Sequence, residues 1–566
     1  MEPIIDFKNY TFKYRSQIEP TLIDINLAIY PGEKVLIVGP SGSGKSTLAN
    51  CINGLVPFSM KGDVTGSLKI KGNDPKELGI FGMSKLVGTV LQDTDGQFIG
   101  LTVAEDVAFA LENDMVEKEE MERRVLETAK SVDIETLLQH APSQLSGGQK
   151  QRVSMAGVMI DKVDILLFDE PLANLDPATG KKAIERIDQI QKENNTTIII
   201  IEHRLEDALY RDVDRIVVMG EGRIVADMTP DELLSKDILQ KQGIREPLYL
   251  AAVRHAGCDI TKEMHPQHIE QMNVESIAVR IREWMKEIKI KEEKISAKEV
   301  LSIENLNFSY QEGEPVLKDI KLSICQGEMV SIVGKNGAGK STLSNIICGF
   351  FPQNSGKIYL DGKDISSLSI KERGEKIGLV MQSPNQMISK PMIFDEVALG
   401  LQVRGVPEEE IKERVYDTLK ICGLYPFRNW PVSALSFGQK KRVTIASILV
   451  MRPEILILDE PTAGQDYRHY TEIMEFLKKI NKEQGITILM ITHDMHLMLE
   501  YTDRAIVIAD GCLIADDKPS NILTNLGIAR KAYLKETSLY ELAKKCQIEN
   551  ESQFVQSFIQ YERERR

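Results

Sequence analysis

Two glycine-rich stretches decide the fold of this chain: GPSGSGKST at residues 39–47 and GKNGAGKST at residues 334–342. Both fit the pattern G-x4-G-K-[ST], and each follows a short apolar run and precedes a stretch that reads as a helix. Glycines at these spacings let consecutive backbone N–H groups turn toward one anion, and the helix directs its positive N-terminus at the same place. The sequence therefore predicts two phosphate-binding loops, each opening a helix.

Each loop ends in a lysine followed by a hydroxyl residue, and the two have different predicted roles. Lys45 and Lys340 can reach the β- and γ-phosphates of a nucleotide, whereas Ser46 and Ser341 can ligate Mg²⁺. The residues predicted to bind nucleotide through these loops are Gly39, Pro40, Ser41, Gly42, Ser43, Gly44, Lys45, Ser46 and Thr47 in the first copy and Gly334, Lys335, Asn336, Gly337, Ala338, Gly339, Lys340, Ser341 and Thr342 in the second.

The motifs that follow show that a whole domain is duplicated. LSGGQ at 145–149 returns as LSFGQ at 435–439, and IEH at 201–203 returns as ITH at 491–493. Both pairs are 290 residues apart, whereas the loop lysines Lys45 and Lys340 are 295 residues apart. The first copy therefore has five extra residues between its glycine loop and its LSGGQ motif. A length change of this kind is typical of a surface loop. One offset over so long a span indicates domain duplication and not a short solenoid repeat.

Apolar runs that alternate with helical stretches predict the α/β class for both copies. Such runs are typical of a mostly parallel sheet with helices on both faces, whose functional residues lie at the carboxyl ends of the strands. We therefore predict two tandem P-loop ATPase domains. The predicted boundaries are 3–240 for the first domain, 241–298 for a helical linker, 299–524 for the second domain and 525–566 for a C-terminal helical tail.

Two carboxylates end one buried strand of each copy: Asp169-Glu170 after ILLF and Asp459-Glu460 after LIL. An aspartate at this position can hold Mg²⁺, and the glutamate beside it can polarise the attacking water. A solvated strand end is the alternative explanation. The intact phosphate loops favour the catalytic interpretation.

LSGGQ and LSFGQ, each about twenty residues before such a strand, resemble the signature loop of ABC-transporter ATPases. The resemblance covers nearly all of both copies. It implies a helical subdomain that carries the signature loop, and a head-to-tail pair of domains that bind ATP and Mg²⁺ between the phosphate loop of one and the signature loop of the other. The signature residues implied to bind ATP are Ser146, Gly147, Gly148, Gln149, Ser436, Gly438 and Gln439.

The same resemblance assigns roles to residues outside the glycine loops. It implies that Glu170, Glu460, His203 and His493 are catalytic, the histidines through the γ-phosphate, and that Gln92 and Gln382 of the glutamine loops bind ATP and metal. Tyr14 and Tyr310 match the aromatic residue that stacks on adenine, and Asp176 and Asp466 match the acidic end of the D-loop, although Gln465 is atypical there. The implied metal ligands are Ser46, Gln92, Asp169, Ser341, Gln382 and Asp459.

Phe437 is the one departure within the signature loops, because it replaces the first of two glycines. Ser436 and Gly438 remain, so we expect the anion site at the start of this helix to survive. Every lysine, glutamate and histidine of the motifs is present in both copies. The sequence therefore predicts two catalytically competent sites.

The stretch QDTDGQFIGLTVAEDVAFALEN at 92–113 resembles the ATPases of energy-coupling factor transporters, and GIREPLY at 243–249 resembles their fused double form. This implies the ATPase subunit of a vitamin or metal importer, peripheral on the cytoplasmic side of the cell membrane, with a transmembrane coupling subunit and a small substrate-capturing membrane subunit. The acidic residues expected to receive an arginine-bearing helix of the coupling subunit, unless they form only a solvated loop, are Asp93, Asp95, Glu105 and Asp106.

Other classes of duplicated ABC protein stay open or are disfavoured. A conventional peptide or metal importer stays open, whereas sugar importers usually have a degraded second phosphate loop. The net charge is −14, and residues 245–298 hold ten Lys/Arg against nine Asp/Glu, so a ribosome-acting protein with a basic linker is disfavoured and no nucleic-acid partner is expected. The cysteines form no CxxC pair, unlike those of DNA-repair ABC proteins. No apolar stretch approaches the roughly 20 residues of a membrane span.

Overall fold

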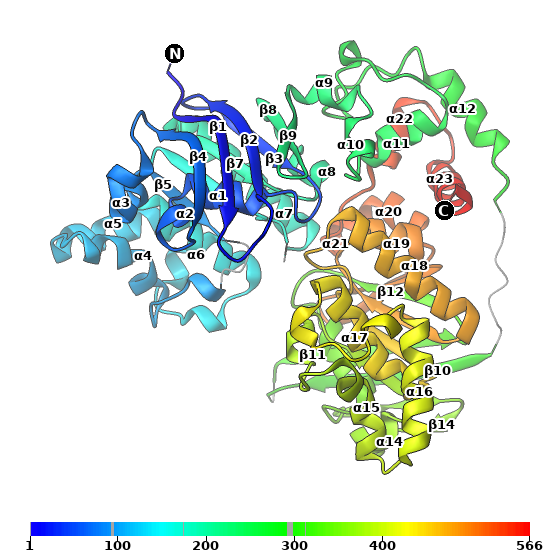
Figure 1. Ribbon diagram of the computed structural model, residues 1–566. Coiled ribbons are helices and arrows are strands. Elements are labelled where there is room, and N and C mark those ends of the chain that lie inside the picture. The colour runs from blue at the N-terminus through cyan, green and yellow to red at the C-terminus, as the bar shows by residue number, and fades with distance from the viewer. Residues whose placement is uncertain (1, 92–94, 174, 291–297, 312, 566) are drawn as a thin grey trace. The chain divides into compact units, whose positions relative to one another are not determined.

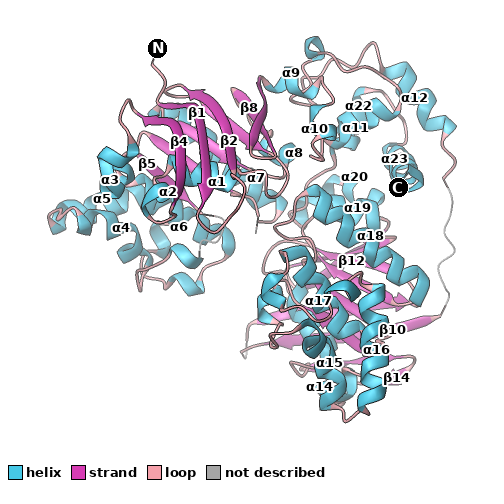
Figure 2. Cartoon of the chain, viewed as in Figure 1, coloured by secondary structure: helices cyan, strands magenta, loops and turns pink. Residues whose placement is uncertain are grey.

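The computed structural model describes residues 2–565, except residues 92–94, 174, 291–297 and 312. The chain forms two compact units, Met1–Arg282 with Asp466–Arg468, and Glu283–Gln465 with His469–Arg566. Each unit contains one mostly parallel sheet flanked by helices, which confirms the predicted α/β class (Figure 1, Figure 2). Among the residues described, no helix has the length and apolar character needed to cross a membrane.

The main sheet of the first unit explains the continuous apolar runs of the sequence. Its strands are, in spatial order, β5 (Val87–Val90), β6 (Ile165–Asp169), β7 (Thr197–Ile201), β3 (Lys34–Val38), β8 (Arg215–Gly220) and β9 (Arg223–Met228). All pairs are parallel except β8 with β9. Every residue of β3 and β7 is buried, since both strands are central. The ends of β3, β6 and β7 therefore place the first glycine loop, Asp169-Glu170 and His203 at one edge of the sheet.

A second, antiparallel sheet was not predicted from the sequence. It consists of β1 (Ile5–Tyr14) between β2 (Leu22–Ile29) and β4 (Gly62–Ile70). Its buried side chains join those of the main sheet and of α1 (Lys45–Ile52) in one hydrophobic cluster, which includes Phe7, Phe12, Ile37 and Leu48. The helix that follows the glycine loop is thus held by side chains from both sheets.

The signature loop of the first unit belongs to a separate group of helices. These are α4 (Val103–Asn113), α5 (Lys118–Ser131) and α6 (Gly147–Met159). Val107, Leu111, Val125 and Val153 lie in their own hydrophobic cluster. This group forms the helical subdomain that the family resemblance implies, and α6 begins directly after Ser146.

The second unit repeats this arrangement. Its main sheet is β15 (Ile377–Val380), β16 (Ile455–Asp459), β17 (Thr487–Ile491), β12 (Met329–Val333), β18 (Arg504–Ala509) and β19 (Cys512–Asp517), and its antiparallel sheet is β11 (Pro315–Cys325), β10 (Glu299–Ser309), β13 (Ser355–Leu360) and β14 (Lys363–Asp364). The helix after its glycine loop is α13 (Lys340–Cys348), and its helical subdomain contains α15 (Ile393–Val403), α16 (Glu408–Ile421) and α17 (Phe437–Leu449).

The repeat continues into the segments predicted as linker and tail. In the first copy α9 (Pro230–Leu234), α10 (Ile238–Lys241) and α11 (Leu248–His255) follow the main sheet, and in the second copy α20 (Pro519–Thr524), α21 (Leu526–Lys531) and α22 (Ser538–Lys545) do so. The first turns of α11 and α22 carry the same buried pair, Leu248-Tyr249 and Leu539-Tyr540. Both segments therefore begin with elements of the duplicated domain.

The rest of the linker provides a core residue of the second unit. Within the segment predicted as a helical linker, α12 spans only Ala278–Glu287, and residues before it form turns, one of them capped by Asn273. Trp284 is 2% exposed, and its ring packs edge-on against Phe554 and Tyr561 of α23 (Glu551–Arg565), at centroid distances of 6.1 and 5.4 Å. The two ends of the second unit are thus joined through one aromatic cluster.

Trp284→Ala is expected to lower the free energy of unfolding of the second unit by about 3 kcal/mol, because a buried aromatic ring leaves a cavity. Trp284 and Trp430 are the two tryptophans of the chain. Denaturant unfolding followed by the fluorescence of Trp430 would measure the loss. Val279→Ala, on the same helix but 56% exposed, is the matched control and should change stability by less than about 0.5 kcal/mol. Equal effects of the two substitutions would contradict a core role for Trp284.

Candidate functional site

Both glycine loops have the backbone shape that a phosphate cradle requires. Gly42 and Gly44 have φ of 77° and 99°, and Gly337 and Gly339 have φ of 77° and 102°. A Cβ on Gly44 would also lie 2.9 Å from the carbonyl oxygen of Thr21, so a larger residue is excluded by contact as well as by backbone angle. The helices α1 and α13 begin at Lys45 and Lys340, directly after these glycines, and the first-turn amides of a helix are suited to bind an anion.

The two loop lysines fold back over their own loops. The Nζ of Lys45 donates to the carbonyl oxygens of Gly39 and Pro40 at 2.8 and 2.9 Å, and Lys340 does the same to Gly334 and Lys335. Burial lowers the pKa of Lys45, and the nearby Glu170 carboxylate opposes that shift. Each ammonium group is therefore held at the mouth of the loop, where phosphate oxygens can replace the carbonyl oxygens as acceptors.

The predicted catalytic glutamates and histidines are in contact in both copies. His203 Nε2 lies 2.8 Å from Glu170 Oε1, and His493 Nδ1 lies 2.7 Å from Glu460 Oε1. Both glutamates have a positive φ, 50° and 44°, which is uncommon for this residue type. Their N–H groups donate to the carbonyl oxygens of Ile201 and Ile491 at 2.8 and 2.9 Å. Each carboxylate is thus fixed to the neighbouring strand that carries its histidine.

The aspartates beside these glutamates lie in a strongly polar, partly desolvated environment. Burial, reinforced by the charge of Glu170, raises the pKa of Asp169 to about 6. Burial and Glu460 likewise raise the pKa of Asp459, although a hydrogen bond from the Ser341 hydroxyl, at 3.2 Å, lowers it. A hydroxyl and a carboxylate so close together are hard oxygen ligands of the kind that Mg²⁺ prefers. The donor set around Ser341 and Asp459 therefore fits this ion.

The signature serines cap the helices that they precede. The hydroxyl of Ser146 accepts the N–H of Gln149, and the hydroxyl of Ser436 accepts the N–H of Gln439 at 3.3 Å. The glutamine side chains accept the serine N–H groups in return, so both loops form complete capping boxes. Phe437 is 46% exposed and leaves this cap unchanged. Gly147, Gly148 and Gly438 lie in the first turns of these helices.

The adenine-stacking candidates lie beside the glycine-loop helices. The hydroxyls of Tyr14 and Thr47 are 3.1 Å apart, and those of Tyr310 and Thr342 are 3.0 Å apart. Tyr310 is 55% exposed, so part of its side chain is accessible to a ligand. Both tyrosines therefore remain candidates for the adenine contact.

The structure places some of the remaining predicted residues, and others lie outside the described residues. Gln92 and Asp93 lie outside the described residues, as does the side chain of Asp95, whereas Gln382 follows β15 and is exposed. Asp176 caps α7 (Pro177–Asn194) by accepting the N–H of Thr179 at 2.8 Å, and Asp466 precedes α18 (Tyr467–Gln484) at the equivalent position.

Two of the acidic residues expected to receive a partner helix accept hydrogen bonds from the backbone of their own loop. Asp106 accepts the N–H groups of Ile99 and Gly100 at 2.8 and 3.0 Å. Glu105 accepts those of Leu101 and Thr102 at 2.8 and 3.2 Å. Both carboxylates hold the start of α4, so charge reversal at Asp106 would disturb the loop itself and is a poor probe of partner binding.

Sequence reasoning missed two buried polar residues next to the site. Glu202, 2% exposed, accepts the N–H groups of Leu172, His203 and Arg204, and burial raises its pKa. The second copy has Thr492 at this position, whose hydroxyl lies 3.3 Å from Glu460 Oε2. The other missed residue is Lys441. A position-by-position comparison of the two copies would have found both, because each position differs between otherwise similar sequences.

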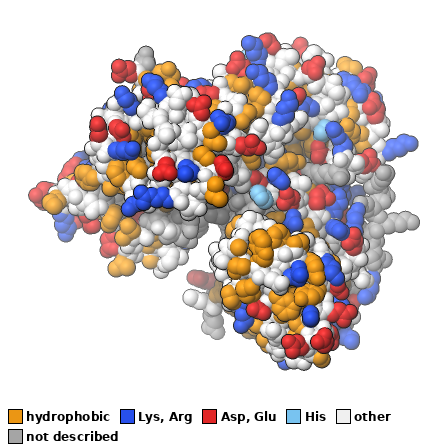
Figure 3. Space-filling view, viewed as in Figure 1, with side chains coloured by type: hydrophobic (Ala, Val, Ile, Leu, Met, Phe, Trp, Pro, Cys, Tyr) orange, Lys and Arg blue, Asp and Glu red, His pale blue; other side chains and the backbone are white. Residues whose placement is uncertain are grey.

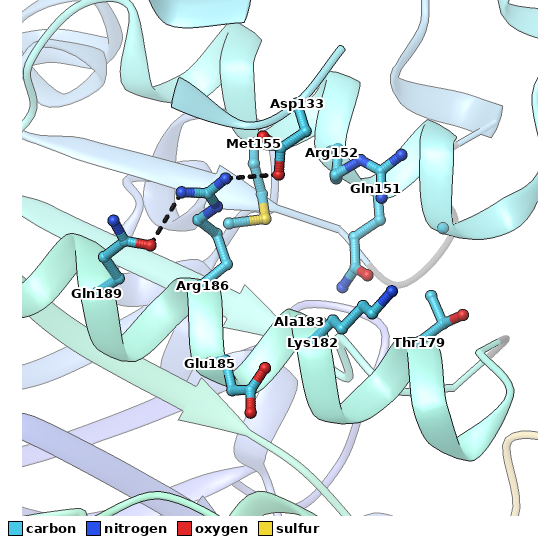
Figure 4. Close-up of a pocket in the computed structure, with 11 residues that line it drawn as sticks. Asp133, Gln151, Arg152, Met155, Thr179, Lys182, Ala183, Glu185, Arg186 and Gln189 are labelled. Atoms are coloured by element: carbon cyan, nitrogen blue, oxygen red, sulfur yellow. Dashed lines mark hydrogen bonds and ion pairs between the residues drawn. The ribbon is translucent and has the colours of Figure 1, made fainter. Parts of the chain in front are cut away.

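A hollow of about 220 Å³ lies between α6 and α7 of the first unit, as Figure 4 shows. It is lined by Gly148 and Gln151 of the signature helix, and one wall is closed by the ion pair between Arg186 and Asp133, at 2.8 Å. The glycine loop, Asp169 and Glu170 do not line it. The hollow is therefore separate from the glycine loop, although Gly148 of the signature loop lines it.

Comparison with known proteins bears on both repeats and on the segment between them. A family model described as ABC transporter matches residues 22–173 and 317–463, and one described as ATP-binding cassette cobalt transporter matches residues 236–308. An ABC transporter ATP-binding protein of Clostridium perfringens is 60% identical over 99% of this chain and 98% of its own length. An ABC transporter ATP-binding protein of Enterococcus faecalis is 59% identical over 100% of this chain and 99% of its own length. A solved structure of cbiO1 from Clostridium perfringens, described as part of the ABC transporter complex cbiONQ, is 40% identical, covers 41% of this chain and 94% of its own, and has a TM-score of 0.39.

Proposed function

Because the chain belongs to the ABC transporter family and carries two of its ATPase domains, we propose that it drives an import complex of the energy-coupling factor type. ATP binding and hydrolysis are properties of the family. The observation that carries the finer assignment is the match of residues 236–308 to a family model described as a cobalt transporter. This match covers the segment that joins the two ATPase domains, where subfamilies of one ATPase fold can differ.

The geometry given above supports the roles that we propose in each half. Lys45 and Lys340 neutralise the phosphates, Glu170 and Glu460 accept a proton from the attacking water, and His203 and His493 hold those carboxylates in place. Tyr14 and Tyr310 orient the adenine, and the signature helices of Ser146 and Ser436 present a second anion site. We propose that ATP draws the phosphate loop of each half toward the signature loop of the other, and that hydrolysis releases them.

Magnesium is the metal that we propose for both halves. Ser46, Asp169 and Gln92 would hold it in the first half, and Ser341, Asp459 and Gln382 in the second. When bound, it would supply positive charge to the phosphate oxygens. The residues of the chain supply the rest of the chemistry, since Glu170 and Glu460 take up the proton and the loop amides bind the phosphate oxygens.

Exposed apolar side chains near the glutamine loops support a membrane partner. Ile99 and Leu101, just before α4, are 67% and 82% exposed, and Phe109 of α4 is 41% exposed. In the second domain Met381 and Val403 are exposed in the corresponding region, and Figure 3 shows apolar side chains gathered on that domain in the region of α17. Apolar surface of this kind is typical of protein–protein contact sites. We propose that it receives a transmembrane coupling subunit, which a small substrate-capturing subunit joins, with the chain peripheral on the cytoplasmic side of the membrane.

Purification of the tagged chain from detergent-solubilised native membranes, with mass spectrometry, tests this function. A transmembrane coupling protein with one or more small, very hydrophobic proteins is expected, and Leu101→Glu should lower their recovery about tenfold by placing a charge in an apolar contact. Val225→Glu, at an exposed position of β9 in the same domain, is the control and should leave recovery unchanged. Two homologous permeases with an extracellular binding protein would indicate a conventional importer. Ribosomal proteins alone would contradict both transport assignments.

A further inference from the structure

Lys441 is a lysine buried in the helical subdomain of the second domain. It lies on the signature helix α17, five residues after Ser436, and is 1% exposed. Its Nζ donates to the backbone carbonyl oxygens of Met381 and Gln382, both at 2.8 Å. Gln382 is the glutamine-loop residue, so a charged side chain joins the signature helix directly to the start of that loop across 59 residues of sequence.

A buried ammonium group is costly unless hydrogen bonds and nearby charges compensate it. Burial lowers the pKa of Lys441 to about 8, while the charges of Asp459 and Glu460 raise it. The group therefore lies within electrostatic reach of the carboxylates that are the candidates for metal binding and proton transfer. A leucine or methionine could fill the same volume without this cost, so simple packing does not account for a lysine here.

The first domain connects its signature helix differently. Gln151 occupies the equivalent position of α6, is 5% exposed, and donates its amide to the carbonyl oxygen of Pro171 at 2.6 Å. Pro171 directly follows the catalytic candidate Glu170. The first signature helix is thus tied to the segment after the carboxylates, whereas the second is tied to the glutamine loop by two charge-assisted hydrogen bonds, which are stronger than neutral ones.

We propose that Lys441 is a positioning residue that holds the start of the glutamine loop against the signature helix, so that Gln382 and Ser436 move together in the second domain. The first domain has a neutral side chain and a different acceptor at this position. The two halves therefore transmit the motion of their glutamine loops unequally, although their catalytic residues match. The inference rests on the roles proposed above for Gln382 and Glu460.

The test uses the full chain with Glu170→Gln as background, so that turnover reports the half containing Glu460. Lys441→Met keeps the volume and removes the donors. It is expected to lower kcat about tenfold, as misplacement of a site group by a fraction of an ångström can, with the KM for ATP changed less than twofold. Amide hydrogen exchange over residues 381–387 is expected to become faster. Lys441→Arg, which keeps charge and donors, should recover most of the lost kcat.

Lys440→Met, at the neighbouring and partly exposed position of the same helix, is the matched control. It should change neither kcat nor the amide exchange over residues 381–387. An unchanged kcat or unchanged amide exchange in Lys441→Met would overturn the proposal, as would an Arg variant that behaves like the Met variant. A fall in kcat that only follows a fall in melting temperature would also overturn it, since that would show a merely structural lysine. If Glu170→Gln alone abolishes turnover, the role proposed for Glu460 fails, and the exchange measurement still decides the role of Lys441.

Discussion

Replacing both Glu170 and Glu460 by glutamine is expected to lower ATP hydrolysis at least about 100-fold, which is the typical loss when a positioned proton acceptor is removed. Each carboxylate lies at the end of a buried strand, has a positive φ and contacts a histidine at 2.7–2.8 Å. Because the two halves share this geometry, each single substitution is expected to remove a substantial part of the rate. Steady-state phosphate release by the purified chain would measure it.

Glu304→Gln, at an exposed position of β10, is the control for the same chemical change elsewhere and should leave the rate unchanged. Binding of ATP should persist in the double variant, because glutamine removes the proton acceptor and leaves the phosphate loops intact. If one single variant kept nearly full activity while the other lost all of it, the two sites would be unequal in catalysis, and the prediction of two competent sites would be wrong.

Replacing both Lys45 and Lys340 by alanine is expected to weaken ATP binding about 10- to 100-fold at each site. Hydrogen bonds to charged groups contribute roughly 1.5–3 kcal/mol, and each of these ammonium groups faces the position of the phosphates. Titration of a fluorescent ATP analogue in the Glu170→Gln and Glu460→Gln background, which prevents turnover, would measure the loss. Lys69→Ala, at an exposed position of β4, is the control and should bind ATP normally.

Stability without nucleotide separates a binding defect from a folding defect in these lysine variants. Both lysines are buried, at 5% and 7% exposed, so alanine relieves the cost of burying a charge but also removes the hydrogen bonds to the loop carbonyl oxygens. Because these two effects oppose each other, the melting temperature of the apo protein is expected to change only modestly. A large fall in melting temperature with normal ATP affinity would contradict a phosphate-binding role for the lysines.

The differences between the two copies are small in sequence but lie close to the chemistry. Glu202 and Thr492 lie near Glu170 and Glu460, and Gln151 and Lys441 anchor the two signature helices to different segments. A search for known motifs assigns no role to these positions, because Glu202 and Thr492 are only the middle residues of IEH and ITH, and Gln151 and Lys441 follow the signature loops. Comparison of the two copies with each other is the signal that reveals them.

The sequence by itself determined the two phosphate loops, the carboxylate pairs, the duplication and the α/β class, because these features depend on short-range requirements. A few residues of sequence are enough to predict each of three features: a glycine with positive φ, a buried strand that ends in two carboxylates, and a serine that caps a helix. The second, antiparallel sheet, the extent of the repeat into residues 241–298 and 525–566, and the place of Trp284 against Phe554 were decided by tertiary structure alone. The same holds for the contacts of His203 with Glu170 and of Lys441 with Gln382. The three side-chain contacts join residues that are 33, 59 and 270 positions apart, and only the packing of the complete domain brings such residues together.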